Sequence, residues 1–191
     1  MARRKDHTRE ELHELAVRCG REIVAAGGPD ALTARSVAGK MGYTPGTLYN
    51  LFENLEGLII AINIGTLDEL GASIHAVLEN GGKPRKILGK IAEAYLSLQA
   101  RHPHLWALLF ATPVSAKSDE YHQAIHRVFD PVVQVLRSVS ADDAAARRDA
   151  KILWATLHGI CHLKQSGKLD VTEEDPPEVL VKQFLKQFLR R

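Results

Sequence analysis

Four polar residues in the first third of the sequence could recognise another molecule through directional contacts: Thr44, Thr47, Tyr49 and Asn50. At the 3.6-residue spacing of a helix they point away from the apolar Leu48 and Phe52. A threonine can contact a thymine methyl group or a phosphate, a tyrosine hydroxyl can reach a phosphate, and an asparagine amide can pair with adenine. These side chains therefore suit contacts with base edges and with the sugar-phosphate backbone.

Two short helices with a glycine turn between them would position these residues. The sequence predicts one helix that Thr33 caps and Gly42 ends, and a second that Thr44 caps, with Pro45 at its first position. Neither helix is long enough to be stable alone. This pattern is typical of a helix-turn-helix, in which one short helix enters the major groove of DNA. Here the helix that starts at Thr44 would take this role, held outward by the helix that starts at Thr33 and by an earlier helix.

The backbone and the cations around these helices add possible phosphate contacts. Free N–H groups at both helix starts can bind phosphates, and Gly46 has no side chain to keep the backbone away from DNA. Arg35 and Lys40 lie in the first short helix. The N-terminal cations could follow the backbone or enter the minor groove, although a solvated tail explains them equally well: Arg3, Arg4 and Lys5.

Residues 31–52, ALTARSVAGKMGYTPGTLYNLF, followed by Leu58, resemble the DNA-binding domain of TetR-type repressors. The matching positions are Thr33, Ala38, Gly42, Gly46, Thr47, Leu48, Tyr49 and Phe52. The similarity extends over roughly residues 8–65. It implies a double-stranded operator as partner and these DNA-binding residues: Thr33, Arg35, Thr44, Pro45, Gly46, Thr47, Tyr49 and Asn50.

Two positions depart from the family pattern. Leu55 stands where the family usually has a phosphate-binding lysine, and Leu51 stands where histidine or tyrosine is common. Each lost phosphate contact lowers affinity for DNA. Operator binding would then depend more on Arg35, Lys40 and the N-terminal cations.

The rest of the chain also shows helical rather than strand periodicity, so the predicted fold is all-α with about nine helices. The first helix starts with a capping box of Thr8 and Glu11. We expect a helix-turn-helix domain over residues 1–54 and a helical ligand-binding and dimerisation domain over residues 55–191. The expected helices span residues 8–27, 33–41, 44–52, 54–78, 84–98 and 105–111, then a seventh from 118 or 119 to 136, an eighth from 142 or 143 to 167 and a ninth over 175–189.

The second domain resembles the C-terminal domain of a TetR subgroup through residues 154–159 (WATLHG), Leu163 and residues 166–169, with Tyr95, His102, Pro103, Leu109 and Phe110 upstream. The resemblance implies a homodimer through helices near 143–166 and 177–190, and a small-molecule pocket. Its candidate lining residues, each of which could instead be ordinary core, are Tyr95, Trp106, Phe110, Phe129, Trp154 and His158. A ligand would act by favouring one arrangement of the helix over residues 54–78. Gly65 and Gly71 in this helix, and Pro131 in the helix that ends at residue 136, are the expected places for bending.

Composition limits the other classes of function. The formal net charge is only +2, so binding to nucleic acid must come from a local surface. Cys19 and Cys161 lie in apolar helical patterns and fit a reducing cytoplasm. The N-terminus has no apolar segment of the secretory kind, and the apolar stretch at residues 58–64 is too short to cross a bilayer.

Neither a metal site nor catalysis is expected. His122 with His126, and His158 with Cys161 and His162, have helical spacings that can bind a metal, but their apolar surroundings favour packing. No cofactor-binding or catalytic motif occurs.

The predicted function is a ligand-released repressor that binds a palindromic operator. The alternatives are a regulator or dimerisation module that acts through a protein partner, an activator with the same DNA-binding domain, and a helical enzyme.

Overall fold

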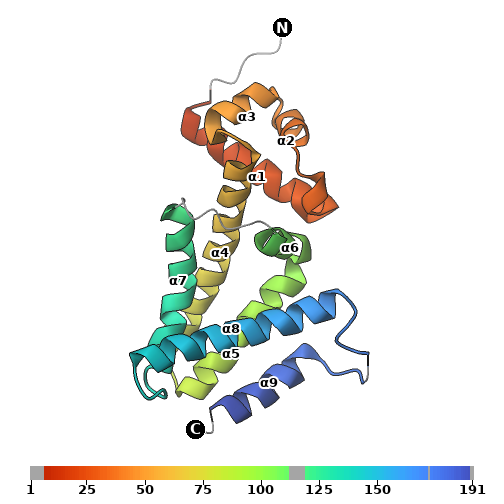
Figure 1. Cartoon of the computed structure of the whole chain (residues 1–191). Coiled ribbons are helices and arrows are strands. Elements are labelled where there is room, and N and C mark those ends of the chain that lie inside the picture. Colours follow the sequence, from red (N-terminus) through yellow and green to blue (C-terminus); the bar gives the residue numbers. More distant parts are fainter. Residues whose placement is uncertain (1–6, 112–118, 172, 190–191) are drawn as a thin grey trace. The chain divides into compact units, whose positions relative to one another are not determined.

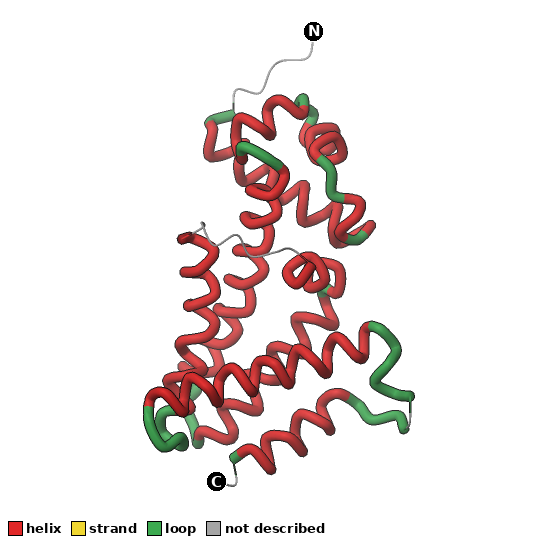
Figure 2. The backbone as a smooth tube through the Cα atoms, viewed as in Figure 1, coloured by secondary structure: helices red, strands yellow, loops and turns green. Residues whose placement is uncertain are grey.

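The computed structural model describes residues 7–111, 119–171 and 173–189, and its regular elements in these ranges are all helical (Figures 1 and 2). The predicted all-α fold is therefore confirmed. The helices are α1 (Arg9–Gly27), the 3₁₀ turn η1 (Pro29–Ala31), α2 (Ala34–Met41), α3 (Pro45–Phe52), α4 (Leu55–Glu79), α5 (Pro84–Arg101), α6 (Pro103–Ala111), α7 (Asp119–Leu136), α8 (Asp143–Gln165) and α9 (Pro177–Phe188).

The described chain packs as two compact units. The headpiece unit contains residues 7–66, 104–111 and 119–121, and the helical unit contains residues 67–103, 122–171 and 173–189. The headpiece unit thus holds α1 to α3, the first half of α4 and α6. The division into domains at residue 54 stays a prediction.

The helix starts follow the capping chemistry of the sequence. Thr8 and Glu11 form the predicted capping box, with the Glu11 N–H 3.2 Å from the Thr8 hydroxyl oxygen. The side-chain oxygen of Asn54 accepts from the Gly57 N–H at 2.9 Å, and that of Asp142 accepts from the Ala145 N–H at 2.6 Å. These bonds satisfy N–H groups that a helix start leaves without partners.

The core of the headpiece unit joins α1 to α4 with α6. Its buried side chains come from α1 (Ala16, Cys19 and Val24), the segment before α2 (Leu32), α2 (Val37, Ala38 and Met41), α3 (Leu48 and Phe52), α4 (Leu58 and Ile62) and α6 (Leu105 and Leu108). At the start of α6, the Nδ1 atom of His104 lies 2.9 Å from the carbonyl oxygen of Ala25. The sequence pattern did not predict that α6 packs with α1 to α4.

Helix α4 is apolar over a longer span than the stretch at residues 58–64 considered above. By length and composition alone it could cross a membrane, and 44% of the window that meets this test is buried within the fold. Leu58 and Ile62 are buried in the headpiece unit, and Leu70 and Ile74 are buried in the helical unit. A helix that is apolar on most sides is typical of a protein core, and we interpret α4 in this way.

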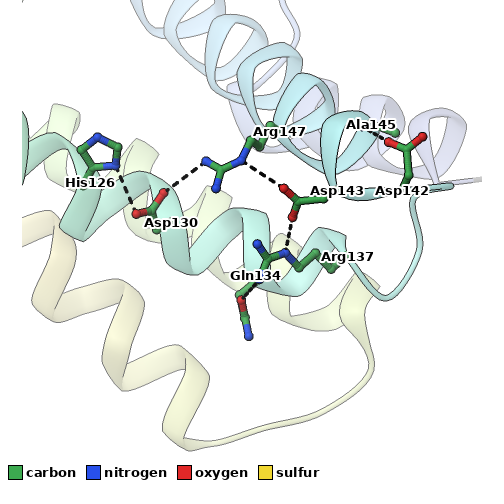
Figure 3. A network of polar contacts seen from close by, with 8 residues as sticks. All are labelled: His126, Asp130, Gln134, Arg137, Asp142, Asp143, Ala145 and Arg147. Atoms are coloured by element: carbon green, nitrogen blue, oxygen red, sulfur yellow. Dashed lines mark hydrogen bonds and ion pairs between the residues drawn. The ribbon is translucent and has the colours of Figure 1, made fainter.

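In the helical unit, the corner between α7 and α8 carries a network of exposed ion pairs (Figure 3). Asp143 accepts from the Nε atoms of Arg137 and Arg147 at 2.6 and 3.3 Å. Arg147 also lies 3.8 Å from Asp130, which in turn contacts His126 at 3.1 Å. The network therefore links the last turns of α7 to the first turn of α8.

We expect Asp143→Asn to lower the Tm at pH 7 modestly and to bring it closer to that of the wild type at acid pH. The hydrogen bond from Arg137, helped by Arg147, holds the pKa of Asp143 below its ordinary value of 3.8. A carboxyl with a depressed folded pKa stabilises the fold above its unfolded pKa, and this contribution disappears as the pH falls through the folded pKa. Thermal unfolding at pH 7, 5 and 3 measures the effect.

The exposed Asp175 supplies the control, because Asp175→Asn changes the charge equally away from this network. The wild-type advantage over Asp143→Asn should shrink once the pH falls below 3.8, the ordinary pKa of the carboxyl, because the unfolded chain then binds a proton before the folded one does. A difference in Tm that stays constant from pH 7 to pH 3 would contradict the electrostatic explanation.

Candidate nucleic-acid interface

Helix α3 is held by one face and exposed on the other. Leu48 and Phe52 are 4% and 8% exposed and belong to the headpiece core, whereas Tyr49 is 51% exposed. Asn50 is exposed beside Tyr49, and Thr47 is half-buried. The remaining candidates at the start of α3 are all exposed: Thr44, Pro45 and Gly46. The predicted outward presentation of α3 is therefore present in the structure.

The turn between α2 and α3 explains this presentation. Gly42 has a left-handed backbone, with φ of +77°, which glycine adopts without a steric penalty. The Tyr43 N–H then donates to the carbonyl of Ala38 at 2.9 Å, so the turn closes tightly after the last residue of α2. Together with the buried side chains of α3, this turn fixes the direction in which the helix leaves α2.

The two helix starts differ in their free backbone groups. At α2, Thr33 and Ser36 form a capping box in which each hydroxyl accepts from the other residue's N–H at 3.0 Å. At α3, the predicted cap is only half correct, because Thr44 occupies the cap position without a side-chain bond to the backbone. Its hydroxyl oxygen instead lies 3.5 Å from that of Thr47. Both hydroxyls are thus close together at the exposed start of α3.

The cations around the interface differ in their availability. Arg35 is exposed and has no ion-pair partner among the described residues. Lys40 instead pairs with Glu22 of α1 at 2.9 Å, and this hydrogen bond raises the pKa of Lys40. Arg3, Arg4 and Lys5 lie outside the described residues. Arg35 is therefore better placed than Lys40 to contact a phosphate.

Leu51 and Leu55, which replace phosphate-binding residues of the family pattern, have a packing role here. Both are half-buried and pack against the headpiece core. Both side chains therefore add to the apolar packing around the headpiece core. This packing gives a physical reason for side chains that cannot bind a phosphate at these positions.

The candidate pocket residues fall into both units. Trp106 and Phe110 belong to α6 in the headpiece unit, where their ring centres are 5.0 Å apart. Phe129 is half-buried on α7, in the same helical unit as the other three candidates: Tyr95, Trp154 and His158.

Tyr95 of α5 forms a cluster with Trp154 and His158 of α8. The Trp154 ring stacks on His158 with 6.3 Å between ring centres. The buried Tyr95 lies close enough to Trp154 and Cys161 for both to influence its pKa. Burial raises the pKa of Tyr95, and burial together with the neighbouring His162 lowers the pKa of His158. Burial also raises the pKa of the Cys161 thiol to about 11. Tyr95, His158 and Cys161 therefore all favour their neutral forms near pH 7.

The histidines considered above as metal ligands have other neighbours. His126 contacts Asp130, and His158 stacks between Trp154 and His162. In residues 7–111, 119–171 and 173–189 no group of three or more potential ligands is arranged to hold a metal ion.

Comparison with known proteins identifies the family. Residues 88–188, more than half of the chain, match the family described as tetracyclin repressor-like, C-terminal domain. The chain belongs to the TetR family of transcriptional regulators. The resemblance seen in the DNA-binding helices is thereby confirmed at the level of the family, and the expectation of a non-enzymatic regulator agrees with it.

Individual relatives agree with this membership. An uncharacterised HTH-type transcriptional regulator of Mycobacterium tuberculosis is 29% identical over 148 residues, which cover 78% of this chain and 67% of the relative. A solved structure of a Rhodococcus protein of unknown function has a TM-score of 0.80 at 22% identity, with 98% of this chain and 97% of that chain covered. The TetR-family repressor FadR of Thermus thermophilus, solved in complex with lauroyl-CoA, has a TM-score of 0.70 at 16% identity and 93% coverage of both chains.

Sequence reasoning missed a polar contact that fixes α1 against α4 in this TetR-family headpiece. The Arg21 guanidinium donates to the Thr66 hydroxyl at 3.0 Å and to the carbonyl of Ile62 at 3.3 Å. Gly65 gives this guanidinium room, because a Cβ there would lie 3.2 Å from it. Arg21 looks like an ordinary surface cation in the sequence, so no local signal could have identified it.

Proposed function

We propose that this chain represses transcription by binding a palindromic operator as a homodimer, and that a small molecule releases it. The outward presentation of α3 carries this proposal, because it leaves Tyr49 and Asn50 accessible while Leu48 and Phe52 anchor the helix. A major groove accepts one such helix through its N-terminal residues. Membership of the TetR family supports the same conclusion.

The contacts proposed for DNA divide into two kinds. Arg35, the Tyr49 hydroxyl and the free N–H groups at the starts of α2 and α3 would bind phosphates and set the register. Thr44, Thr47 and Asn50 would contact base edges, with Pro45 and Gly46 allowing close approach and Thr33 shaping the start of α2. Because each subunit contributes one headpiece, the two half-sites would lie about 34 Å apart, one turn of the double helix.

Replacing Thr47 with alanine together with Tyr49 with phenylalanine should weaken operator binding at least about tenfold, because two hydrogen bonds per headpiece are lost. Neither substitution changes charge, so the dependence of affinity on salt should stay the same. Arg35→Gln should instead flatten the slope of log affinity against log salt by about 0.9 for each phosphate contact that is lost. Fluorescence anisotropy with the palindrome upstream of the protein's own gene measures both quantities.

Ser97→Ala, which removes an exposed hydroxyl from α5 in the helical unit, is the matched control and should bind like the wild type. Equal affinity of the double variant and the wild type for the palindrome would exclude α3 as the recognition helix. If the affinity of the wild type for DNA depends on neither the DNA sequence nor the salt concentration, the operator-binding function itself is excluded.

The proposed homodimer would form through α8 and α9. Helix α8 exposes Ile152 by 46% and Leu163 by 41%, and both lie on the same stripe as Ala155 and Gly159. Val179 on α9 is 51% exposed. Exposed apolar side chains around small residues favour close packing against a second copy, with two helices contributed by each subunit.

Release by a small molecule is supported by fold relatives and by the aromatic clusters. Thermus FadR shares the fold and was solved with lauroyl-CoA. The proposed ligand contacts stay those of the sequence analysis, on α5, α6, α7 and α8: Tyr95, Trp106, Phe110, Phe129, Trp154 and His158. Binding would favour one arrangement of α4, and a ligand can shift this equilibrium only through different affinities for the two arrangements. Arg21 would transmit a movement of α4 to α1.

A second candidate function follows from Leu51 and Leu55. Because these residues cannot bind phosphates, the chain could act through a protein partner, with its helical unit mainly as a dimerisation module. The salt and sequence dependence described above separates this alternative from operator binding.

An activator would bind DNA in the same way and would differ only in its effect on transcription. Either regulator would act in the cytoplasm, where the two free thiols stay reduced.

A further inference from the structure

A groove lies between α5 and α9 within the helical unit, where these two helices pack side by side (Figure 1). The groove is open to solvent on one side and has a volume of about 470 Å³, and the buried residues Leu96, Val181 and Leu185 form its floor. This volume lies within the range of small-molecule sites, which combine apolar walls with a few polar groups. None of the groove residues belongs to the ligand contacts proposed above.

Cations dominate the rim of this groove. Arg85, Lys86 and Lys90 line it from α5 and Lys182 lines it from α9, against two carboxylates, Glu93 and Glu178. None of these four cations has an ion-pair partner among the described residues.

The position of these cations at the start of α5 strengthens their pull on an anion. Arg85 and Lys86 lie in the first turn, which contains no acidic residue and has no side-chain cap. The positive end of a helix dipole disfavours cations and attracts anions. The cations of the rim therefore repel one another and the positive end of α5, and a bound negative group would relieve this repulsion.

Gly89 is an independent sign that the groove is kept open. It lies inside α5, where glycine is less favourable than alanine. Its φ is not positive, and nothing lies within 4 Å of the position that a Cβ would take. Neither backbone conformation nor packing therefore requires glycine here, and its structural effect is to leave space beside the apolar floor.

We propose that this groove binds a single-chain anionic amphiphile, with its aliphatic chain on Leu96, Val181 and Leu185 and its negative group at the cations of α5. The lining explains the choice of a small molecule. It consists of ten residues, whereas a stable interface between proteins takes about 20–30 residues from each partner. The apolar floor selects an aliphatic chain over a small hydrophilic anion such as phosphate. This inference does not rest on DNA binding or on the proposed repression.

Titration calorimetry with dodecanoate below its micelle concentration tests the proposal on the full chain. The wild type should bind it, while dodecyltrimethylammonium, which has the same chain length and a positive head, and inorganic phosphate should not bind measurably. Gly89→Leu should abolish binding at the groove and keep or raise the Tm, because its side chain enters open space. The combined change Arg85→Gln, Lys86→Gln and Lys90→Gln should weaken binding about tenfold or more.

Matched controls separate the groove from the rest of the protein. Gly39→Leu introduces the same side chain at another helical glycine with nothing within 4 Å, and Arg148→Gln, Lys151→Gln and Lys168→Gln remove three exposed cations outside the groove. Both should bind dodecanoate like the wild type. Undiminished binding in Gly89→Leu, or equal affinity for the cationic amphiphile, would overturn the proposal. Binding to phosphatidylglycerol vesicles without binding to monomeric dodecanoate would overturn it too, since the ligand would then be a membrane surface.

Discussion

Replacing Gly57 with alanine should lower the free energy of unfolding by about 2–3 kcal/mol, as overpacking of a tight site does, and should abolish operator binding. A Cβ at Gly57 would overlap the carbonyl oxygen of Phe52 and would lie 3.3 Å from its carbonyl carbon. The obstructing atoms belong to the backbone, so no change of rotamer can relieve the overlap. The end of α3 or the start of α4 must move instead.

The turn around Gly57 has little freedom to adapt. Glu53 has a φ of +61°, which is unusual for a residue with a side chain, and the Asn54 N–H bonds back to the Phe52 carbonyl at 2.6 Å. The Asn54 side chain in turn accepts from the Gly57 N–H at 2.9 Å. A shift at Gly57 would therefore disturb both the cap of α4 and the direction of α3, the proposed recognition helix.

Chemical denaturation and anisotropy with the operator fragment together test this prediction. Gly39→Ala is the matched control, because Gly39 lies in α2 with nothing within 4 Å of its Cβ position. This control should keep or slightly increase stability, since alanine is favoured over glycine in a helix by up to about 1 kcal/mol. Unfolding of Gly57→Ala at the same denaturant concentration as the wild type would show that the turn tolerates the side chain.

The helices were predictable because their ends depend on local chemistry. Thr8 with Glu11, Asn54 and Asp142 mark helix starts through bonds to residues three positions away, and Gly42 marks an end through its left-handed backbone. Such contacts depend on sequence separation alone. The outward face of α3 was predictable for the same reason, since Leu48 and Phe52 differ in type from Tyr49 and Asn50.

Contacts between distant segments were not predictable. Leu105 and Leu108 of α6 enter the headpiece core, and Arg21 bonds to Thr66 across 45 positions of sequence. An apolar stripe identifies a buried face but does not identify what buries it. The role of Gly57 was hidden similarly, because the sequence indicates a glycine without indicating the carbonyl that faces it. The candidate pocket shares this limit, since aromatic side chains suit both a core and a ligand site.

Replacing Ile152 with aspartate should convert the proposed homodimer into monomers and weaken operator binding by roughly 100-fold or more, because linking two binding modules raises overall affinity by about 10²–10⁴. Ile152 is 46% exposed on α8 in the isolated subunit. An aspartate there would remain solvated in a monomer, whereas in a dimer it would become a buried charge without a partner. The substitution should therefore act on assembly and not on the fold of the subunit.

Val171→Asp is the matched control, because Val171 is 77% exposed and lies outside α8 and α9. Sedimentation equilibrium should give a dimer for the wild type and for this control, and a monomer for Ile152→Asp with helical circular dichroism unchanged. The remaining affinity of Ile152→Asp should be that of one headpiece for one half-site, so a fragment with a single half-site should bind the variant and a wild-type subunit equally. If Ile152→Asp stays dimeric while Val171→Asp dissociates, the α8 face is excluded as the dimer contact. The contact would then lie near Val171.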